Sequence, residues 1–548
     1  MFIKRIILIA SLFIVHSLKA QEIPIATSNG VYIFLNQMAA LQYEFPWNDL
    51  IKPVSHGEVI KALEKLNTQK ENLTIQQQKE LNFYLHAFSK FNHLNDIDSF
   101  YKQKSLLSFI NKWSEVGYEE KKNKIDIRPL IGTSISNYQG SSILERNIGV
   151  TLSGTFENKF DYFFSYRDIS LDGNGIKNIQ TIGPQLKYVN VGDAANLKSK
   201  NFNELRASLA YHFKNGVVSI GQDRFSWGYG QDAQIVLSQN APAYPNIKLK
   251  YNPFKWMQFN YMHAWLQSSL VDSAQTYSYN TTTYGGYHQQ YKPKFFAIHS
   301  ITFIPKPGIE ISIGESIVYT NRLNPGYLIP IMYFKSFDNT SNNQNILAGD
   351  NGQMFFGFSL RRWIPKTQLY GQLFIDEMRI TKMFSRENRN QLGYQLGIKK
   401  AKWFGNEKWV MGAEYTRNRP FIYSNINPVL NYTHHDQNLG DWMGNNSDRT
   451  LLYTQYTPLS KLVAKLSYEM IRKGGTGTID DQYLAIPQPA FLFDPLFTQK
   501  SVNLEVRYQW QRNIHLQLLT SYTSLNNSPS NSRTNTNYLQ AGLYMGLY

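Results

Sequence analysis

The chain has 548 residues, which is more than one ordinary globular domain contains, and it has no cysteine. The lack of cysteine excludes a disulfide scaffold, a thiol nucleophile, a cysteine zinc site and a lipoprotein anchor. A formal net charge of +16 favours an anionic partner, such as nucleic acid, an acidic polysaccharide or lipopolysaccharide phosphate, although a solvated basic surface would carry the same charge.

Residues 1–20 predict a secretory signal peptide. A positive segment ends at Arg5, an apolar core runs from Ile6 to Val15, and Ala20 ends a candidate cleavage site. The apolar core is too short to span a bilayer as a helix. We therefore expect an exported chain, which argues against nucleic acid as the partner and favours anionic polysaccharide or lipopolysaccharide.

Residues 21–124 have helical spacing rather than strand-like alternation. Ser55 and Glu58 form a capping-box pattern at the start of one helix, and Thr74 and Gln77 start a second helix in a similar way. The apolar positions of the three expected helices are Val59, Ile60, Leu63 and Leu66; Leu81, Tyr84, Leu85 and Phe88; and Leu106, Leu107, Ile110 and Trp113. We expect a small periplasmic helical region, beside or under the rest of the protein.

Residues 125–548 alternate with a period of two. In the segment 502–510, Val502, Leu504, Val506, Tyr508 and Trp510 share one face of a strand, and polar or charged side chains occupy the other. Similar segments occupy residues 148–152, 160–166, 205–213, 309–313, 392–398, 409–415 and 462–470. Repeated strands with one apolar and one charged face predict a transmembrane β-barrel, in the outer membrane of a Gram-negative cell.

The length of this part allows roughly 16 to 20 strands at about 10 residues each plus their connections. Polar stretches at 277–291, 339–352, 425–449 and 474–498 are the expected extracellular loops. A mean hydropathy of −0.40 agrees with a barrel, because alternation hides the lipid-facing residues in a polar average. The aromatic content of 14% suits girdles at the two membrane interfaces, and a sugar-stacking surface would use the same residues.

The alternation also predicts which charges face the lumen. These residues are Asp161, Arg167, Arg206, His212, Glu310, Lys399, Glu414, Lys461, Lys465, Glu469, Glu505 and Arg507. Because both signs are mixed, we expect them to pair with one another across the wall. A conducting pore is the alternative.

Motifs for catalysis are weak, so we expect no enzyme, no cofactor and no metal. The chain has no nucleophile elbow, no His-Glu-x-x-His and no phosphate loop. His434 and His435 are adjacent, so they point apart in an extended chain and favour a loop contact over a metal site. Asp376 and Glu377 point apart on a strand for the same reason, which disfavours paired glycosidase carboxylates.

The segment 218–245 carries the most informative side chains. A strand leads into a Trp-Gly-x-Gly turn and then into Leu-Ser-x-Asn-Ala and prolines. Flat aromatics beside amide and guanidinium donors suit sugar rings and uronate carboxylates. The candidate polysaccharide-binding residues here are Arg224, Trp227, Tyr229, Gln239, Asn240 and Tyr244. The alternative, equally weighted, is an in-folded loop that braces the barrel.

This segment resembles the Wzi family of outer-membrane capsule assembly proteins. The resemblance continues through 324–330, 345–350, 369–377 and 414–423, and then Tyr432, Leu439, Gly440, Gly444 and Asp448. It implies an 18-stranded barrel with periplasmic helices that binds capsular polysaccharide like a lectin, without catalysis. The segment 414–423 adds Arg417, Arg419 and Tyr423 to the candidate binding residues.

The Tyr-rich loops and the helical region also resemble gliding-motility surface proteins of Bacteroidetes, of the RemB type. Three functions therefore follow as hypotheses. The first is a barrel that binds and anchors capsular or other surface polysaccharide through many weak contacts. The second is a gliding-motility or adhesion protein that docks a surface protein partner, and the third is a porin or uptake channel.

Overall fold

The computed structural model describes residues 22–89, 116–120, 122–176, 189–190, 198–279, 286–341, 349–378, 390–475, 488–511 and 513–546. The expected signal peptide, the third expected helix and parts of three of the expected loops lie outside these ranges. Within them, no helix has both the length and the apolar character needed to cross a membrane.

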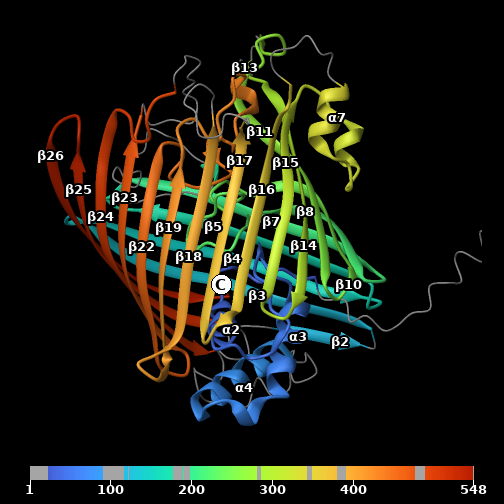
Figure 1. The fold of residues 1–548 in the computed structure, drawn as a ribbon, viewed down its shortest axis with the longest axis vertical. Helices are drawn as coiled ribbons and strands as arrows, with labels where there is room; N and C mark the ends of the chain where they lie inside the picture. Colours follow the sequence, from blue (N-terminus) through green and yellow to red (C-terminus); the bar gives the residue numbers. More distant parts are fainter. Residues whose placement is uncertain are drawn as a thin grey trace, which may run out of the picture.

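In the described part of the chain, 18 antiparallel strands close into a barrel (Figure 1). Closure occurs between the last strand and the first wall strand, with Tyr538 opposite Tyr138 and Met545 opposite Ile131. The wall strands are β3 (Asn123–Tyr138), β4 (Ser141–Phe156), β5 (Phe160–Asp172), β7 (Ser199–Phe213), β8 (Gly216–Asp223), β10 (Tyr244–Phe254), β11 (Met257–Val271), β14 (Tyr291–Lys306), β15 (Ile309–Thr320), β16 (Asn351–Ile364), β17 (Thr367–Glu377), β18 (Gln391–Trp403), β19 (Asn406–Asn418), β22 (Ser447–Leu459), β23 (Leu462–Gly474), β24 (Pro495–Gln511), β25 (Ile514–Asn527) and β26 (Ser532–Met545). The predicted barrel is confirmed.

The predicted alternation sets the register of the wall. Between β23 and β24, Leu466 lies opposite Leu504, while Lys465 lies opposite Glu505. Val502 and Trp510 are exposed on the outer face, and Arg507 is buried in the lumen. A slip of one residue would exchange the two faces, so the contrast between lipid and lumen fixes the pairing.

The two ends of the barrel differ in the length of their connections. At the short-turn end, two or three residues join consecutive wall strands, as at residues 214–215, 307–308 and 460–461. At the long-loop end, much longer segments join the strands, including residues 224–243, 321–350 and 419–446. Short periplasmic turns and longer extracellular loops are typical of outer-membrane barrels.

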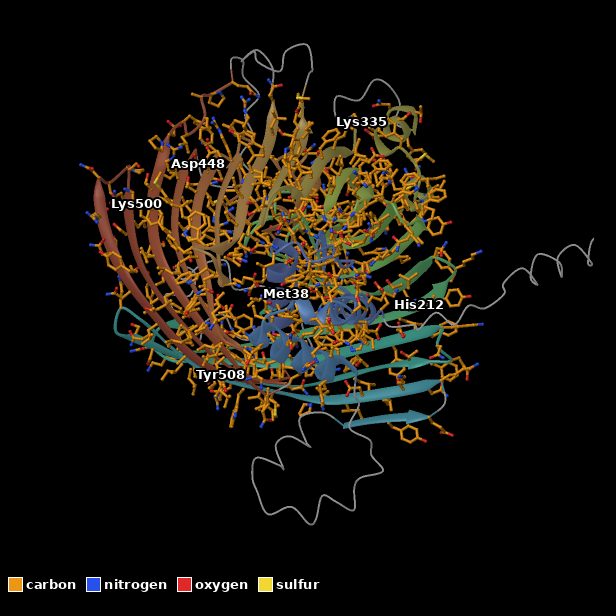
Figure 2. The ribbon with its side chains drawn as sticks, turned by 60° about the horizontal axis from the view of Figure 1, so that its bottom comes forward. Met38, His212, Lys335, Asp448, Lys500 and Tyr508 are labelled. Carbon is orange, nitrogen blue, oxygen red and sulfur yellow. The ribbon has the colours of Figure 1, made fainter. Side chains whose placement is uncertain are left out.

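The N-terminal helices occupy the short-turn end (Figures 1 and 2). They are α2 (Gly30–Ala40), α3 (His56–Asn67) and α4 (Ile75–Ser89). The predicted capping box forms between Ser55 and Glu58. Most of α2 is buried, and its core includes Ala401 and Val410 from the wall. Figure 2, with this end turned forward, shows the helices across the opening with Met38 among them.

The expected helical region extends to residue 124, but residues Val116–Glu120 form strand β2. This strand pairs with the first residues of β3, from Val116 opposite Ile127 to Glu120 opposite Asn123. The physical reason is the free backbone edge of β3 beside the barrel, which a short extended segment satisfies with hydrogen bonds.

Two connections of the long-loop end fold into the lumen and meet there. We call residues 224–243 and 419–446 together the plug. They contain the short strands β9 (Ser226–Trp227), β20 (Thr433–His434) and β21 (Gln437–Asn438), and the turn η6 (Pro428–Leu430). Strand β9 pairs with β1 (Ile51–Lys52), which ties the plug to the N-terminal region.

A third connection covers the outer wall instead. We call residues 325–341 the strap; it contains the turn η4 (Pro325–Leu328) and the helix α7 (Phe334–Ser341), which lies outside the barrel in Figure 1. Phe334 and Tyr327 are fully buried against β11, β14 and β15. The backbone N–H of Phe334 donates to Glu315 at 2.7 Å. Glu315 alternates with the exposed Ile311 and Ile313, so the strap covers a carboxylate on the outer face.

Candidate functional site

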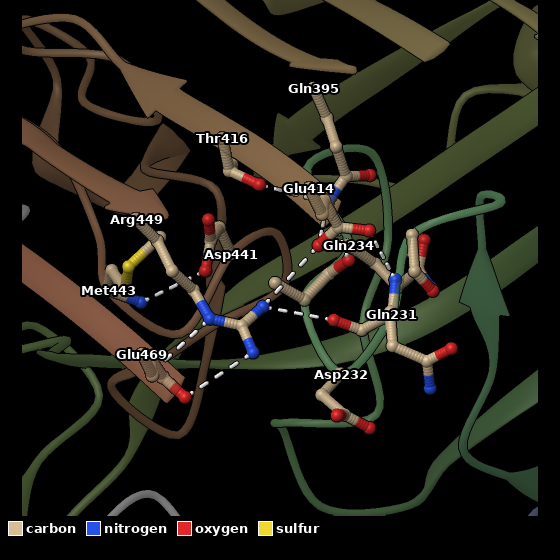
Figure 3. A network of polar contacts seen from close by, with 12 residues as sticks. Gln231, Asp232, Gln234, Gln395, Glu414, Thr416, Asp441, Met443, Arg449 and Glu469 are labelled. Atoms are coloured by element: carbon tan, nitrogen blue, oxygen red, sulfur yellow. Dashed lines mark hydrogen bonds and ion pairs between the residues drawn. The ribbon is translucent and has the colours of Figure 1, made fainter. Parts of the chain in front are cut away.

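A buried ion network attaches the plug to the barrel wall (Figure 3). Arg449 of β22 lies 3.4 Å from Glu414 of β19 and 3.2 Å from Glu469 of β23. Its guanidinium also donates to the backbone oxygen of Gln231 at 2.9 Å, and the N–H of Gln231 donates to Glu414 at 2.7 Å. Because every charge in this network has a partner, the network holds the plug backbone at a fixed position in the lumen.

Other lumen charges pair in the same way. Lys465 contacts Asp232 of the plug at 2.8 Å, and Arg361 contacts Glu310 at 3.4 Å. Further ion pairs join Arg167 to Glu204 and Arg206 to Asp223, and Nε2 of His212 lies 2.7 Å from the carboxylate of Asp161. The prediction that inner-face charges of both signs pair across the wall is confirmed for these residues.

The four candidate binding aromatics come together, but inside the plug core. Trp227, Tyr229, Tyr244 and Tyr423 are all buried in one apolar cluster. The hydroxyl of Tyr423 donates to the backbone oxygen of Ile235 at 2.8 Å. Neighbouring protein groups cover these rings, so this arrangement agrees with the bracing alternative. Their part in sugar binding stays a prediction.

The two candidate amides have a different environment. Gln239 accepts a hydrogen bond from Thr27 at 2.9 Å, and the amide of Asn240 donates to the backbone oxygen of Asn438 at 3.3 Å. Both residues line a polar cavity of about 570 Å³ between α2, the plug and the wall, which we call the lumen chamber. Of the nine candidate binding residues, these two line the lumen chamber.

The backbone oxygen of Arg224 accepts a hydrogen bond from the amide of Gln239 at 3.4 Å, but its side chain has a different environment. Its guanidinium is 2.6 Å from Glu204 of β7, within an ion cluster that also holds Arg167 and Arg206. It lines a smaller cavity of about 130 Å³ beside α4. A protein carboxylate therefore already occupies the position that a uronate would take.

The last two candidates, Arg417 and Arg419, form a basic pair at the long-loop end of β19. The guanidinium of Arg417 lies 3.6 Å from the ring centroid of Phe491. Partial burial, together with the neighbouring charge of Arg417, lowers the pKa of Arg419. In the described ranges, no carboxylate forms an ion pair with either side chain. Two close cations that form no ion pair with a described carboxylate make this position suitable for an acidic ligand.

The positions first considered for chemistry have structural contacts. The Nδ1 atom of His434 accepts the N–H of Gln267 at 2.9 Å. Asp376 accepts the N–H of Tyr423 at 2.7 Å. Over the described residues, no group of three His, Asp or Glu side chains is arranged to hold a metal ion.

A family model for the capsule assembly protein Wzi matches residues 136–539, well over half of the chain. The chain belongs to the Wzi family. The resemblance to the Wzi family that the sequence shows is thereby confirmed. The barrel fold and the outer-membrane location of the chain follow from the family and from the closed barrel. No curated protein matches the sequence.

The solved structure of Escherichia coli Wzi has the same fold. The chain is similar to Wzi of Escherichia coli, described as an outer-membrane, carbohydrate-binding β-barrel involved in group 1 capsule assembly, with 13% identity, a TM-score of 0.58 and coverage of 96% of this chain and 99% of that one. OccK5 of Pseudomonas aeruginosa follows with 10% identity, a TM-score of 0.40 and coverage of 77% and 98%. OccAB2 of Acinetobacter baumannii has 8% identity, a TM-score of 0.43 and coverage of 77% and 97%.

Sequence reasoning missed part of the interior of this Wzi-family barrel. Arg449 was not among the predicted lumen charges, although it has the inward parity of Leu451 and Tyr453 on β22. Arg449 directly follows Asp448 at the end of the expected loop 425–449, so it was assigned to the loop and its inward-facing strand position was not recognised. The role of Trp442 and Lys52 at the lumen chamber had no local signal, because the chamber exists only where distant segments meet.

Proposed function

We propose that this Wzi-family barrel binds and anchors an acidic capsular or other surface polysaccharide, like a lectin and without catalysis. The long-loop end faces the cell exterior and the N-terminal helices lie on the periplasmic side, as is usual for such barrels. The observation that carries the proposal is the basic pair, Arg417 and Arg419, beside Phe491 at the long-loop end. Family membership and the printed description of the Escherichia coli Wzi support it.

The chemistry of the basic pair suits an acidic polymer. A guanidinium forms two parallel hydrogen bonds with a carboxylate, and an aromatic ring offers an apolar face to a sugar ring. Each contact is weak, but a polymer repeats the same unit, so simultaneous contacts at many barrels hold it firmly. Lipopolysaccharide phosphate, present in the same leaflet, would compete for the same cations.

The test is the double variant Arg417→Gln/Arg419→Gln in cells that carry surface polysaccharide. The matched control is Arg322→Gln/Arg533→Gln, which removes the same charge from two exposed side chains at the same end of the barrel. We expect the first variant to shed several times more polysaccharide into the medium at an unchanged level of folded barrel, and the control to retain it. Equal retention in both variants would contradict the proposal.

The other two hypotheses have separate readouts. A channel gives stable single-channel conductance in planar bilayers. A gliding or adhesion protein, the role suggested by the RemB-type resemblance, retains a surface protein partner after the glycan has been removed. Either result without any effect of the arginine variants would replace polysaccharide anchoring as the function.

A further inference from the structure

The lumen chamber has the dimensions and the lining of a saccharide site. Its volume of about 570 Å³ lies within the range of roughly 300–1,000 Å³ that small-molecule sites have. Side chains that both donate and accept hydrogen bonds dominate its wall: Asn36, Gln231, Gln234, Gln239, Asn240 and Gln455. Such amides match sugar hydroxyls, and the indole of Trp442 adds a flat apolar face.

The chamber lies on the helix side of the plug. Three of its wall residues, Lys399, Val410 and Gln455, are each four residues from the short-turn end of their strands. Thr27, just before α2, and Asn36, within α2, line the chamber from the same side. The plug therefore separates the chamber from the basic pair at the long-loop end.

Among the cations around the chamber, Lys399 differs from its neighbours in its contacts. Lys52 lies 3.4 Å from Asp49, and Arg361 lies 3.7 Å from the same carboxylate while it also contacts Glu310. Lys399 lines the chamber, and among the described residues it forms no ion pair. Asp232 is occupied by Lys465. Asp49 and Glu414 are close enough to act on Lys399, but both are paired with other cations, which favours an anionic ligand beside Lys399.

We propose that the lumen chamber binds an acidic oligosaccharide segment of two or three sugars, with a hexuronate carboxylate at Lys399 and Lys52. The amides take the sugar hydroxyls, and Trp442 covers a ring face. This inference rests on the proposed function, because it assigns a second site for the same acidic polymer. The barrel then holds the polymer at two levels, outside the plug and beneath it.

The test is titration calorimetry on the purified full-length barrel in detergent. The probes are tetragalacturonate and the neutral maltotetraose, and the background variant is Arg417→Gln/Arg419→Gln, which removes the outer basic pair. We expect tetragalacturonate to bind at least tenfold more tightly than maltotetraose. Lys399→Gln should weaken that binding about tenfold, and Lys399→Glu should abolish it, each at an unchanged melting temperature.

The matched control is Lys400→Gln. This residue is the next one on β18, points to the other face and donates to the backbone oxygen of Pro365 at 3.3 Å. It should leave binding unchanged. Equal binding in the Lys399 and Lys400 variants would overturn the chamber site. Absence of tetragalacturonate binding, while barrels with the outer pair intact still hold the polymer, would overturn it too and leave the proposed function standing. If those barrels also fail to hold the polymer, both proposals fail.

Discussion

At the scale of single residues, Arg449 illustrates how charge organises the lumen. It is nearly fully buried, yet it joins two wall strands to the plug backbone. Arg449 stabilises this arrangement because each buried charge has a partner, whereas burying an unpaired charge costs free energy. Gln231 completes the arrangement from the plug side through both its N–H and its carbonyl oxygen.

Replacing Arg449 with leucine should detach the plug from the wall. The variant leaves Glu414 and Glu469 without their buried cation, a loss of roughly 3–5 kcal/mol for such pairs. We expect a lower melting temperature and faster amide hydrogen exchange at residues 230–236. Arg146→Leu is the control, because Arg146 pairs with Asp172 while the two side chains are 57% and 36% exposed, and exposed pairs contribute up to about 1 kcal/mol. Identical exchange in the two variants would refute the role of Arg449.

At the scale of elements, the strap shows how a connection hides polar wall residues. His299 and Glu315 face outward from β14 and β15, where lipid would otherwise meet them. Phe334 covers them with its ring, 4.5 Å from that of His299, and with its backbone N–H on Glu315. The strap therefore replaces lipid on this part of the wall by protein that can hydrogen-bond.

Phe334→Ala should release the strap. Removing a fully buried phenylalanine costs about 3–5 kcal/mol, which exceeds what so short a helix can supply by itself. We expect trypsin to cleave after Lys335 much faster in this variant, with the barrel still folded. Tyr333→Ala removes an exposed neighbouring ring and should leave cleavage slow. Unchanged cleavage of the Phe334 variant would show that the strap is held by other contacts.

At the scale of the whole molecule, a polar barrel interior is filled from both ends. The N-terminal helices close the short-turn end, and the plug packs its aromatic core in the lumen. The two bodies meet where β1 pairs with β9, with Ile51 opposite Trp227. Among the described residues, the space that remains includes the lumen chamber and the smaller cavity beside α4.

The filled lumen predicts electrical behaviour. The intact barrel should give no stable single-channel conductance in planar bilayers, because the plug core excludes water and ions from the cross-section. Replacing residues 425–441 by a short Gly/Ser linker should produce conductance steps. A similar replacement of residues 276–288, which lie in the β11–β14 connection and outside the plug, serves as the control. Conductance of the intact barrel would revive the channel hypothesis.

The sequence by itself determined the barrel, the faces of its strands and the capped helix at Ser55. These features follow from neighbouring residues, because the side-chain period of a strand and the hydrogen bonds of a helix cap are local. It also determined that charges of both signs face inward and pair, although it missed Arg449. Its candidate binding residues fell into separate environments, a core, a chamber, an ion cluster and an outer basic pair, which the sequence did not distinguish.

Only the tertiary structure decided which connections fold inward, which one covers the wall and where a cavity remains. Arg449 and Gln231 are 218 residues apart, and Tyr423 and Ile235 are 188 apart. Nothing in either segment alone specifies such a contact, since it depends on the barrel having closed around both. The physical reason is that the free energies of burial and of charge pairing depend on surfaces that come together only in the folded barrel. Alternation, in contrast, depends on the residues of a single strand.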